Sequence, residues 1–110
     1  MAYAVAGLTG DGSMITWDAI TGAVGGTGLE VNNTAGVIGA VQVIGGTAGS
    51  IALQGSLDGT NWVTLKDPSN TDIALTTLGA YAEFTTAARF IRPLGNGSSS
   101  AAIVRVVLRG

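Results

Sequence analysis

The chain contains no cysteine and no histidine among its 110 residues. Without cysteine there can be no disulfide bond, thiol nucleophile or thiolate metal ligand. Without histidine the chain lacks the commonest general base and the commonest transition-metal ligand. Lys66 is the single lysine, and the spacing of the acidic residues forces no two carboxylates together. Because no serine or threonine then has a base to activate it, we expect no enzyme activity and no cofactor.

Charge is also scarce. Charged residues make up 11% of the chain, whereas ordinary soluble domains contain about 25%. Hydrophobic residues make up 46%, so a free monomer would have few charges to keep it apart from its neighbours. Permanent interfaces are depleted in charge, and we therefore expect stable association, although a neutral, threonine-rich monomer would have the same composition. The net charge of −2 offers no basic footprint for nucleic acid.

The N-terminal sequence MAYAVAGLTGDG has neither the basic region nor the unbroken apolar core of a signal peptide. The longest apolar stretch, 35–46, contains Gln42 and four glycines. It is much shorter than the roughly 20 residues of a membrane span. We therefore expect no secretory route and no contact with a membrane.

Eighteen glycines are spread along the chain, and each one inside a helix would cost about 1 kcal/mol relative to alanine. Short apolar runs between turn residues instead predict ten strands, with the spacing of a β-sandwich or barrel. The predicted strands are 3–8, 14–18, 28–31, 37–44, 50–57, 62–66, 71–75, 80–85, 89–94 and 102–109. In 50–57 the alternation puts Ile51, Leu53 and Leu57 on one buried face. The strand 37–44 is apolar on both faces except for Gln42, so it either lies between two layers or meets another subunit.

The first thirty residues look different from the rest. The segment TGAVGGTG (21–28) has four glycines in eight residues and separates two short apolar segments from the strand-rich remainder. We interpret residues 1–30 as an N-terminal arm or edge segment and residues 31–110 as the β-sandwich domain. An ordinary long loop would explain the same segment. No GK[ST] sequence or helical pattern follows the glycines, so they do not indicate a phosphate site.

Four aspartates, Asp11, Asp58, Asp67 and Asp72, fall in predicted turns. They lack the spacing of an EF-hand, and an aspartate in a turn usually caps its own backbone. We therefore expect no metal site. Lys66 stands next to Asp67, which predicts a solvent-exposed ion pair.

The two tryptophans admit two interpretations. With Asn61 and Asp58, the side chains of Trp17 and Trp62 could form a sugar-binding platform. A lone tryptophan at the start of a strand is more often an anchor in a core or an interface.

The sequence GSLDGTNWVTL (55–65), followed by FTTAARFIRP (84–93), resembles the SxDGxxWxxL…aRyiR pattern of discoidin-like, galactose-binding jelly-roll domains. The same pattern is frequent in small virion proteins of tailed bacteriophages. The match spans 51–108 and includes Ser56, Asp58, Gly59, Trp62, Leu65, Ala88, Arg89, Phe90, Ile91 and Arg92. It implies an all-β, jelly-roll-like sandwich in which the Asp-Gly pair makes a hairpin turn and the tryptophan seals one end of the core. In that family the arginine of the second motif tends to be held by local polar partners. Sugar and lipid binding do not carry over, because the chain is shorter than a discoidin domain and lacks its cysteine pair.

The small size, low charge and abundance of alanine, glycine and threonine are similar to those of phage capsid decoration, or cement, proteins. That resemblance implies a homotrimer on the virion surface that binds the major capsid protein and stabilises the shell against internal DNA pressure. Many weak contacts repeated by symmetry would suffice for this. A small tail or head-fibre module and a glycan-binding β-sandwich module are the alternatives.

Two sets of residues carry these expectations. The core is expected to include Trp62, Leu65, Phe90 and Val106. Contacts to the capsid are expected from the arm, at Tyr3, Val5, Leu8, Met14, Ile15 and Trp17. Removing residues 1–20 should then weaken shell binding and leave the sandwich folded.

Overall fold

The computed structural model describes residues 3–7, 12–31 and 37–109. They form ten strands in two antiparallel sheets, and each strand overlaps one of the predicted ranges. The strands are β1 (Tyr3–Gly7), β2 (Gly12–Ile20), β3 (Leu29–Glu30), β4 (Val37–Thr47), β5 (Ile51–Ser56), β6 (Val63–Thr64), β7 (Ala74–Leu75), β8 (Tyr81–Thr86), β9 (Phe90–Leu94) and β10 (Ser100–Arg109). No helix able to cross a membrane occurs in these ranges. The prediction of an all-β sandwich is confirmed.

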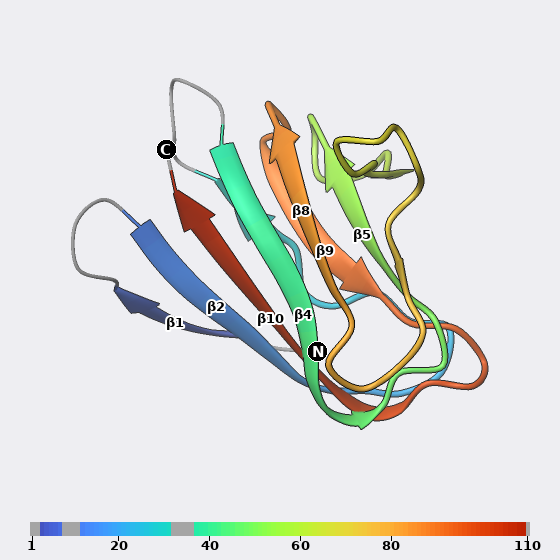
Figure 1. Ribbon diagram of the computed structural model, residues 1–110. Coiled ribbons are helices and arrows are strands. Elements are labelled where there is room, and N and C mark those ends of the chain that lie inside the picture. The colour runs from blue at the N-terminus through green and yellow to red at the C-terminus, as the bar shows by residue number, and fades with distance from the viewer. Residues whose placement is uncertain (1–2, 8–11, 32–36, 110) are drawn as a thin grey trace.

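The strands are ordered as in a jelly roll. Sheet A has the order β1-β2-β10-β4-β8, and Figure 1 shows its first four strands side by side. Sheet B has the order β3-β9-β5-β6, with the short strand β7 on the same edge of β5 as β6. From β2 to β5 and again from β8 to β10, successive strands alternate between the sheets. This alternation gives the two four-stranded layers of a jelly roll, to which β1 adds an outer strand.

The core lies between the sheets and follows the alternation of side chains along each strand. Its fully buried residues include Trp17, Phe84, Ile15, Ile20, Ile51, Leu53, Ile91, Val41, Val43, Val104 and Val106. The prediction for Val106 is confirmed, and Leu65 packs against the core from its margin. Trp62 and Phe90 are only half-buried and lie outside the core cluster. Because Ile91 points inward from β9, its neighbour Phe90 points outward, and the prediction for these two aromatic residues is wrong.

Residues 12–30 belong to the sandwich and do not form a separate arm. Strand β2 pairs with β1 on one side and with β10 on the other. Its side chains Ile15, Trp17 and Ile20 are fully buried. The predicted domain boundary at residue 30 is therefore wrong for this segment. Removing residues 1–20 would take the two strands β1 and β2 and three core side chains from sheet A, so we expect the truncated chain to unfold.

The glycine-rich segment forms the edge of sheet B instead of a loose linker. The N–H of Gly26 donates to the carbonyl of Pro93 at 2.8 Å, and Trp17 Nε1 donates to the carbonyl of Thr27 at 2.8 Å. A Cβ on Gly26 would lie 2.6 Å from Trp17 Cδ1, and a Cβ on Gly28 would lie 3.0 Å from Trp62 Cη2. These glycines thus make room for the two tryptophan rings. A bias toward glycine looks the same in sequence whether it serves flexibility or close packing.

Replacing Gly26 by alanine should lower the free energy of unfolding by about 1–3 kcal/mol, because an added methyl group forces a packed core to shift. Urea denaturation of the Gly26→Ala variant measures the change. The control is Gly97→Ala, since nothing lies within 4 Å of a Cβ at that position. That control should stay within about 0.5 kcal/mol of the wild type. Equal stability of the two variants would contradict the packing described here.

Candidate functional site

The turn after β5 is held by its own polar side chains. Ser56 Oγ accepts the N–H groups of Asp58 at 3.2 Å and Gly59 at 2.9 Å, and its hydroxyl donates to Asp58 Oδ1 at 3.0 Å. Asp58 Oδ1 also accepts the N–H groups of Thr60 and Asn61, both at 2.8 Å. Gly59 has a φ of 80°, a conformation that glycine adopts without steric cost. The predicted turn is confirmed, and its polar atoms bind one another.

The carboxylate of Asp58 is fully engaged within this turn. Besides the three bonds to Oδ1, its Oδ2 accepts the Nδ2–H of Asn61 at 2.7 Å. The backbone N–H groups of Asn61 and Thr60, followed by the side chains of Asn61 and Ser56, hold the pKa of this carboxyl well below its usual range. Such a group stays ionised, and four hydrogen bonds within its own turn already use both of its oxygens. It acts as a structural cap.

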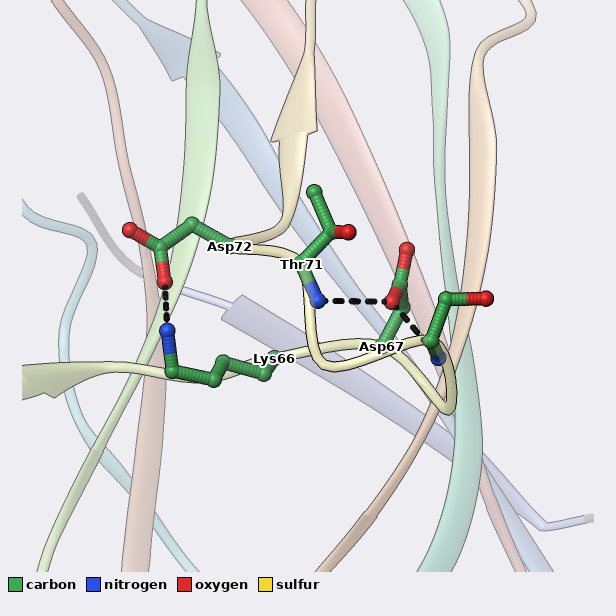
Figure 2. A network of polar contacts seen from close by, with 5 residues as sticks. Lys66, Asp67, Thr71 and Asp72 are labelled. Carbon is green, nitrogen blue, oxygen red and sulfur yellow. Dashed lines mark hydrogen bonds and ion pairs between the residues drawn. The ribbon is translucent and has the colours of Figure 1, made fainter.

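A second turn, between β6 and β7, is shown in Figure 2. Lys66 Nζ pairs with Asp72 Oδ1 at 2.7 Å. The predicted pair with Asp67 is therefore wrong, because Asp67 Oδ1 instead accepts the N–H groups of Ser69 at 2.9 Å and Thr71 at 3.0 Å. No group of three or more metal-binding side chains occurs in the described part of the chain, and Asp11 lies outside it. The pair of Lys66 and Asp72 is exposed, so it contributes at most about 1 kcal/mol.

Trp62 lies over the outer surface of sheet B. Its ring stacks on the guanidinium of Arg92, with 4.2 Å between Arg92 Cζ and the ring centroid. Arg92 Nε donates to Gln54 Oε1 at 2.8 Å. Partial burial lowers the pKa of Arg92 from its usual value. This cation–π contact occupies one face of the Trp62 ring, and Trp17 is buried in the core. The two tryptophans are thus not brought together on a sugar-binding platform.

The other matched arginine is also held locally. Arg89 Nη2 lies 2.8 Å from Glu30 Oε2, and Arg89 Cζ lies 5.3 Å from the ring centroid of Phe90. The arginines of the matched motif are therefore fixed by neighbouring side chains, as the resemblance implies. The matched residues therefore serve the fold, and most of their polar groups are already bonded to neighbouring side chains.

Several of the residues predicted to contact a capsid are not on the surface. Ile15 and Trp17 are fully buried, so the prediction is wrong for both, because β2 directs them into the core. Tyr3 is half-buried and packs against Trp17, with 5.6 Å between the ring centroids. Val5 is exposed on the outer strand β1, and Leu8 lies outside the described residues. The predicted contact set is therefore not one continuous surface.

Met14, the remaining residue of the predicted contact set, points outward from β2 beside Val107 of β10. It belongs to the outward surface of sheet A, here called the sheet-A face. The centre of this face is apolar and consists of Ile38, Ala40, Tyr81 and Val107, which line a groove of about 320 Å³. Ile38 is 65% exposed and Tyr81 is 56% exposed, so the described part of the chain does not cover them. Strand β4 therefore has one face in the core and one face open.

Charges of both signs lie on the sheet-A face. Glu83 projects from β8 next to Ala40, whereas Arg109 and Arg105 project from β10 next to Ile38 and Gln42. Glu83 and Arg109 also line the groove. Tyr81 Oη donates to Glu83 Oε2 at 3.0 Å, and this hydrogen bond raises the pKa of Tyr81. Among the described residues the ion pairs are those of Lys66 with Asp72 and Arg89 with Glu30. Within that part of the chain, Glu83 and Arg109 thus have no ion-pair partner.

A second open surface lies between the turn after β5 and the loop after β8, at the upper end of Figure 1. We call this cavity of about 450 Å³ the end hollow. Its lining residues are Gly55, Ser56, Leu57, Asp58, Asn61, Val63, Leu65, Thr86, Ala87 and Ala88. A Cβ on Gly55 would lie 2.9 Å from both Ala88 Cβ and Leu65 Cδ2, so glycine at this position lets these two side chains pack closely against β5.

The edge of the end hollow is apolar. Leu57 is 76% exposed and Val63 is 65% exposed. The prediction that Leu57 shares the buried face of its strand is wrong, because β5 ends at Ser56 and the chain turns away from the core. The strand alternation in the sequence does not reveal where that turn begins.

Neither the protein-family models nor the curated protein sequences identify a relative. The fold and the two surfaces therefore define the chain as a small jelly-roll sandwich with an open sheet face and an open hollow at one end.

Replacing Asp58 by alanine should lower the free energy of unfolding at neutral pH, because backbone N–H groups lose their acceptor. The carboxyl has a lower pKa in the folded chain than in the unfolded one. Its contribution is therefore complete above about pH 4 and is lost as the pH falls toward the folded value. Denaturation across this range should show the gap between wild type and Asp58→Ala narrowing in acid.

The control for that experiment is Asp72→Ala, which removes the carboxylate of the exposed ion pair with Lys66. It should change stability little at any pH. A gap for Asp58→Ala that stays constant down to pH 2 would show that the carboxylate charge has no part in holding the turn.

Proposed function

We propose that the chain is a structural protein of a tailed-phage virion, and specifically a capsid decoration protein that binds the outer shell and stabilises it against internal DNA pressure. The observation that supports this most directly is the presence of two separate open apolar surfaces, the sheet-A face and the end hollow. A decoration protein makes two kinds of contact, with the shell and with other copies of itself. Monomeric proteins rarely leave large apolar patches uncovered.

The end hollow is proposed as the contact to the major capsid protein. Its walls are mostly apolar, and the one carboxylate in its lining, that of Asp58, is bonded within its own turn. A volume of about 450 Å³ accommodates a leucine or aromatic side chain. The proposed occupant is therefore an apolar side chain on a loop of the capsid protein. Repetition over the shell adds many such contacts and raises the effective concentration at each site.

This proposal moves the capsid contact away from the N-terminal residues named from sequence. Ile15 and Trp17 are in the core and have no surface to offer. The rim residues Leu57 and Val63 are exposed and take their place. The homotrimer implied by the resemblance, and the position on the virion surface, stay predictions.

The two alternatives differ from this proposal in what they would bind. A tail or head-fibre module would use the same surfaces at another place on the virion, so immunogold labelling of virions separates the two. A glycan-binding module would need an open aromatic platform, whereas one face of the Trp62 ring is stacked on Arg92. Titration with oligosaccharides while recording Trp62 fluorescence tests that alternative directly.

Replacing Val63 by aspartate should reduce binding to the shell at least about tenfold, because docking would then bury a carboxylate with no partner. The measurement is co-sedimentation with shells of the phage that encodes the chain, stripped of the protein beforehand. The control is Leu78→Asp, since Leu78 is similarly exposed at 63% but lies outside the end hollow.

That control should bind as the wild type does. Circular dichroism verifies that both variants are folded. Wild-type protein that fails to bind such shells would refute the proposed function, whereas equal binding of the two variants would refute the end hollow as the contact.

A further inference from the structure

We infer that the sheet-A face is a self-association surface on which a second copy of the chain packs face to face, about a two-fold axis that runs along β4. This inference rests on the proposed function, because it names the partner of one of the two surfaces that support it. It is carried by the arrangement of apolar and charged side chains on the described part of sheet A.

The apolar centre of the face follows β4 and its two neighbours. In the strand register Val107 of β10 lies beside Ala40 of β4, and Ala40 lies beside Glu83 of β8. Two residues along the same strands in one direction Arg109 lies beside Ile38, and two residues in the other direction Arg105 lies beside Gln42. The negative charge is thus on one side of β4, and the positive charges are on the other. Neighbouring strands are about 4.8 Å apart, so β4 separates the strands of the two charges by about 10 Å.

A two-fold axis along β4 makes these charges complementary. The rotation lays the β8 strand of the second copy over β10 of the first and keeps residues at the same level along the strands. The partner's Glu83 then lies over Val107, two residues along β10 from Arg109. Two residues span about 7 Å and packed sheets lie about 10 Å apart, distances that a long arginine side chain pointing into the interface can bridge. Because the contact is isologous, the same ion pair forms twice.

The other face-to-face axis, running across the strands, gives the opposite result. It places β8 over β8 and β10 over β10, so that Glu83 faces the partner's negatively charged strand and Arg109 faces the partner's positively charged strand. Like charges across an interface cost several kcal/mol. The charge pattern therefore selects the axis along β4.

The remaining side chains fit such an interface. Ile38, Ala40 and Val107 would be buried at the centre, where interfaces are apolar, and the charges would lie toward the rim. The hydroxyl of Tyr81, 3.0 Å from Glu83 Oε2, already orders the carboxylate. An isologous contact pairs two copies, whereas a trimer requires two different patches in contact. The geometry of this face thus points to a dimer as the unit of association through it, whereas a homotrimer would need contacts between other surfaces.

The test exchanges the two charges. Sedimentation velocity at micromolar concentration should show a dimer for the wild type. Glu83→Arg and Arg109→Glu alone should each weaken the dimer at least about tenfold, because each sets like charges against one another. The double variant Glu83→Arg with Arg109→Glu should recover part of the lost affinity, since the pair with residue 109 is then reversed while Arg105 keeps its charge.

The matched control is the double exchange Glu30→Arg with Arg89→Glu, because that pair is exposed on sheet B. It should leave the dimer intact. All these changes are at exposed side chains, and circular dichroism confirms folding. A wild-type monomer at high concentration, a trimer insensitive to the single exchanges, or a double variant as weak as the singles would each overturn the inference.

The shell-binding assay separates this inference from the proposed function. A wild-type protein that is monomeric yet binds shells overturns the self-association and keeps the decoration function. A dimer that responds to the charge exchanges yet never binds shells keeps the self-association and overturns the decoration function.

Discussion

The burial of Trp17 is the contact on which the rest of the sandwich depends. The ring lies on β2, at full burial between the sheets, and its Nε1–H donates to the carbonyl of Thr27 in the segment that leads to sheet B. Gly26 can lie against the ring only because it has no Cβ. A single aromatic side chain thus fixes the second strand of sheet A, the glycine-rich edge of sheet B and the distance between the layers. A large aromatic residue in a core contributes more buried area than any other.

This packing explains where the sequence is informative and where it is not. Alternation and turn residues are local, and they located all ten strands and the Asp58 turn. The role of the glycines in 21–28 depends on which side chains pack against them in the fold, here Trp17 and Trp62. The local sequence does not show these contacts. The same is true of Lys66, whose partner lies across a turn. The sequence pattern therefore does not show that residues 12–30 are part of the sandwich, and it leaves both a core position and a capsid contact open for Trp17.

The candidate surfaces illustrate the same limit. The predicted strand 37–44 is apolar on both faces, which indicates that each face packs against something. In the structure the outward face is uncovered by the described residues, and Ile38 is exposed. The end hollow could not be foreseen, because it is made by the end of β5, the short strand β6 and the loop before β9, which are separated in the chain. Leu57 and Val63 can be recognised as the edge of the end hollow only after these segments have packed together.

A functional rationale follows from how the polar groups are used. The aspartates of the turns bind backbone or a neighbouring lysine, and the matched arginines stack on or pair with adjacent side chains. Few charges are left on the surface to keep a free monomer soluble. The surfaces left over are apolar and are suited to contact with protein, which is what a small part of a large symmetric assembly requires.

The central proposal is that the chain is a component of the outside of a phage shell and that other proteins cover its two apolar surfaces there. Electron cryomicroscopy of virions of the phage that encodes it tests this most directly. The account predicts densities of about 36 × 28 × 26 Å per copy on the outer shell, with the β5–β6 turn directed at the capsid protein. The account would be contradicted by virions that have no such density on the shell, and equally by virions that have it on the tail alone.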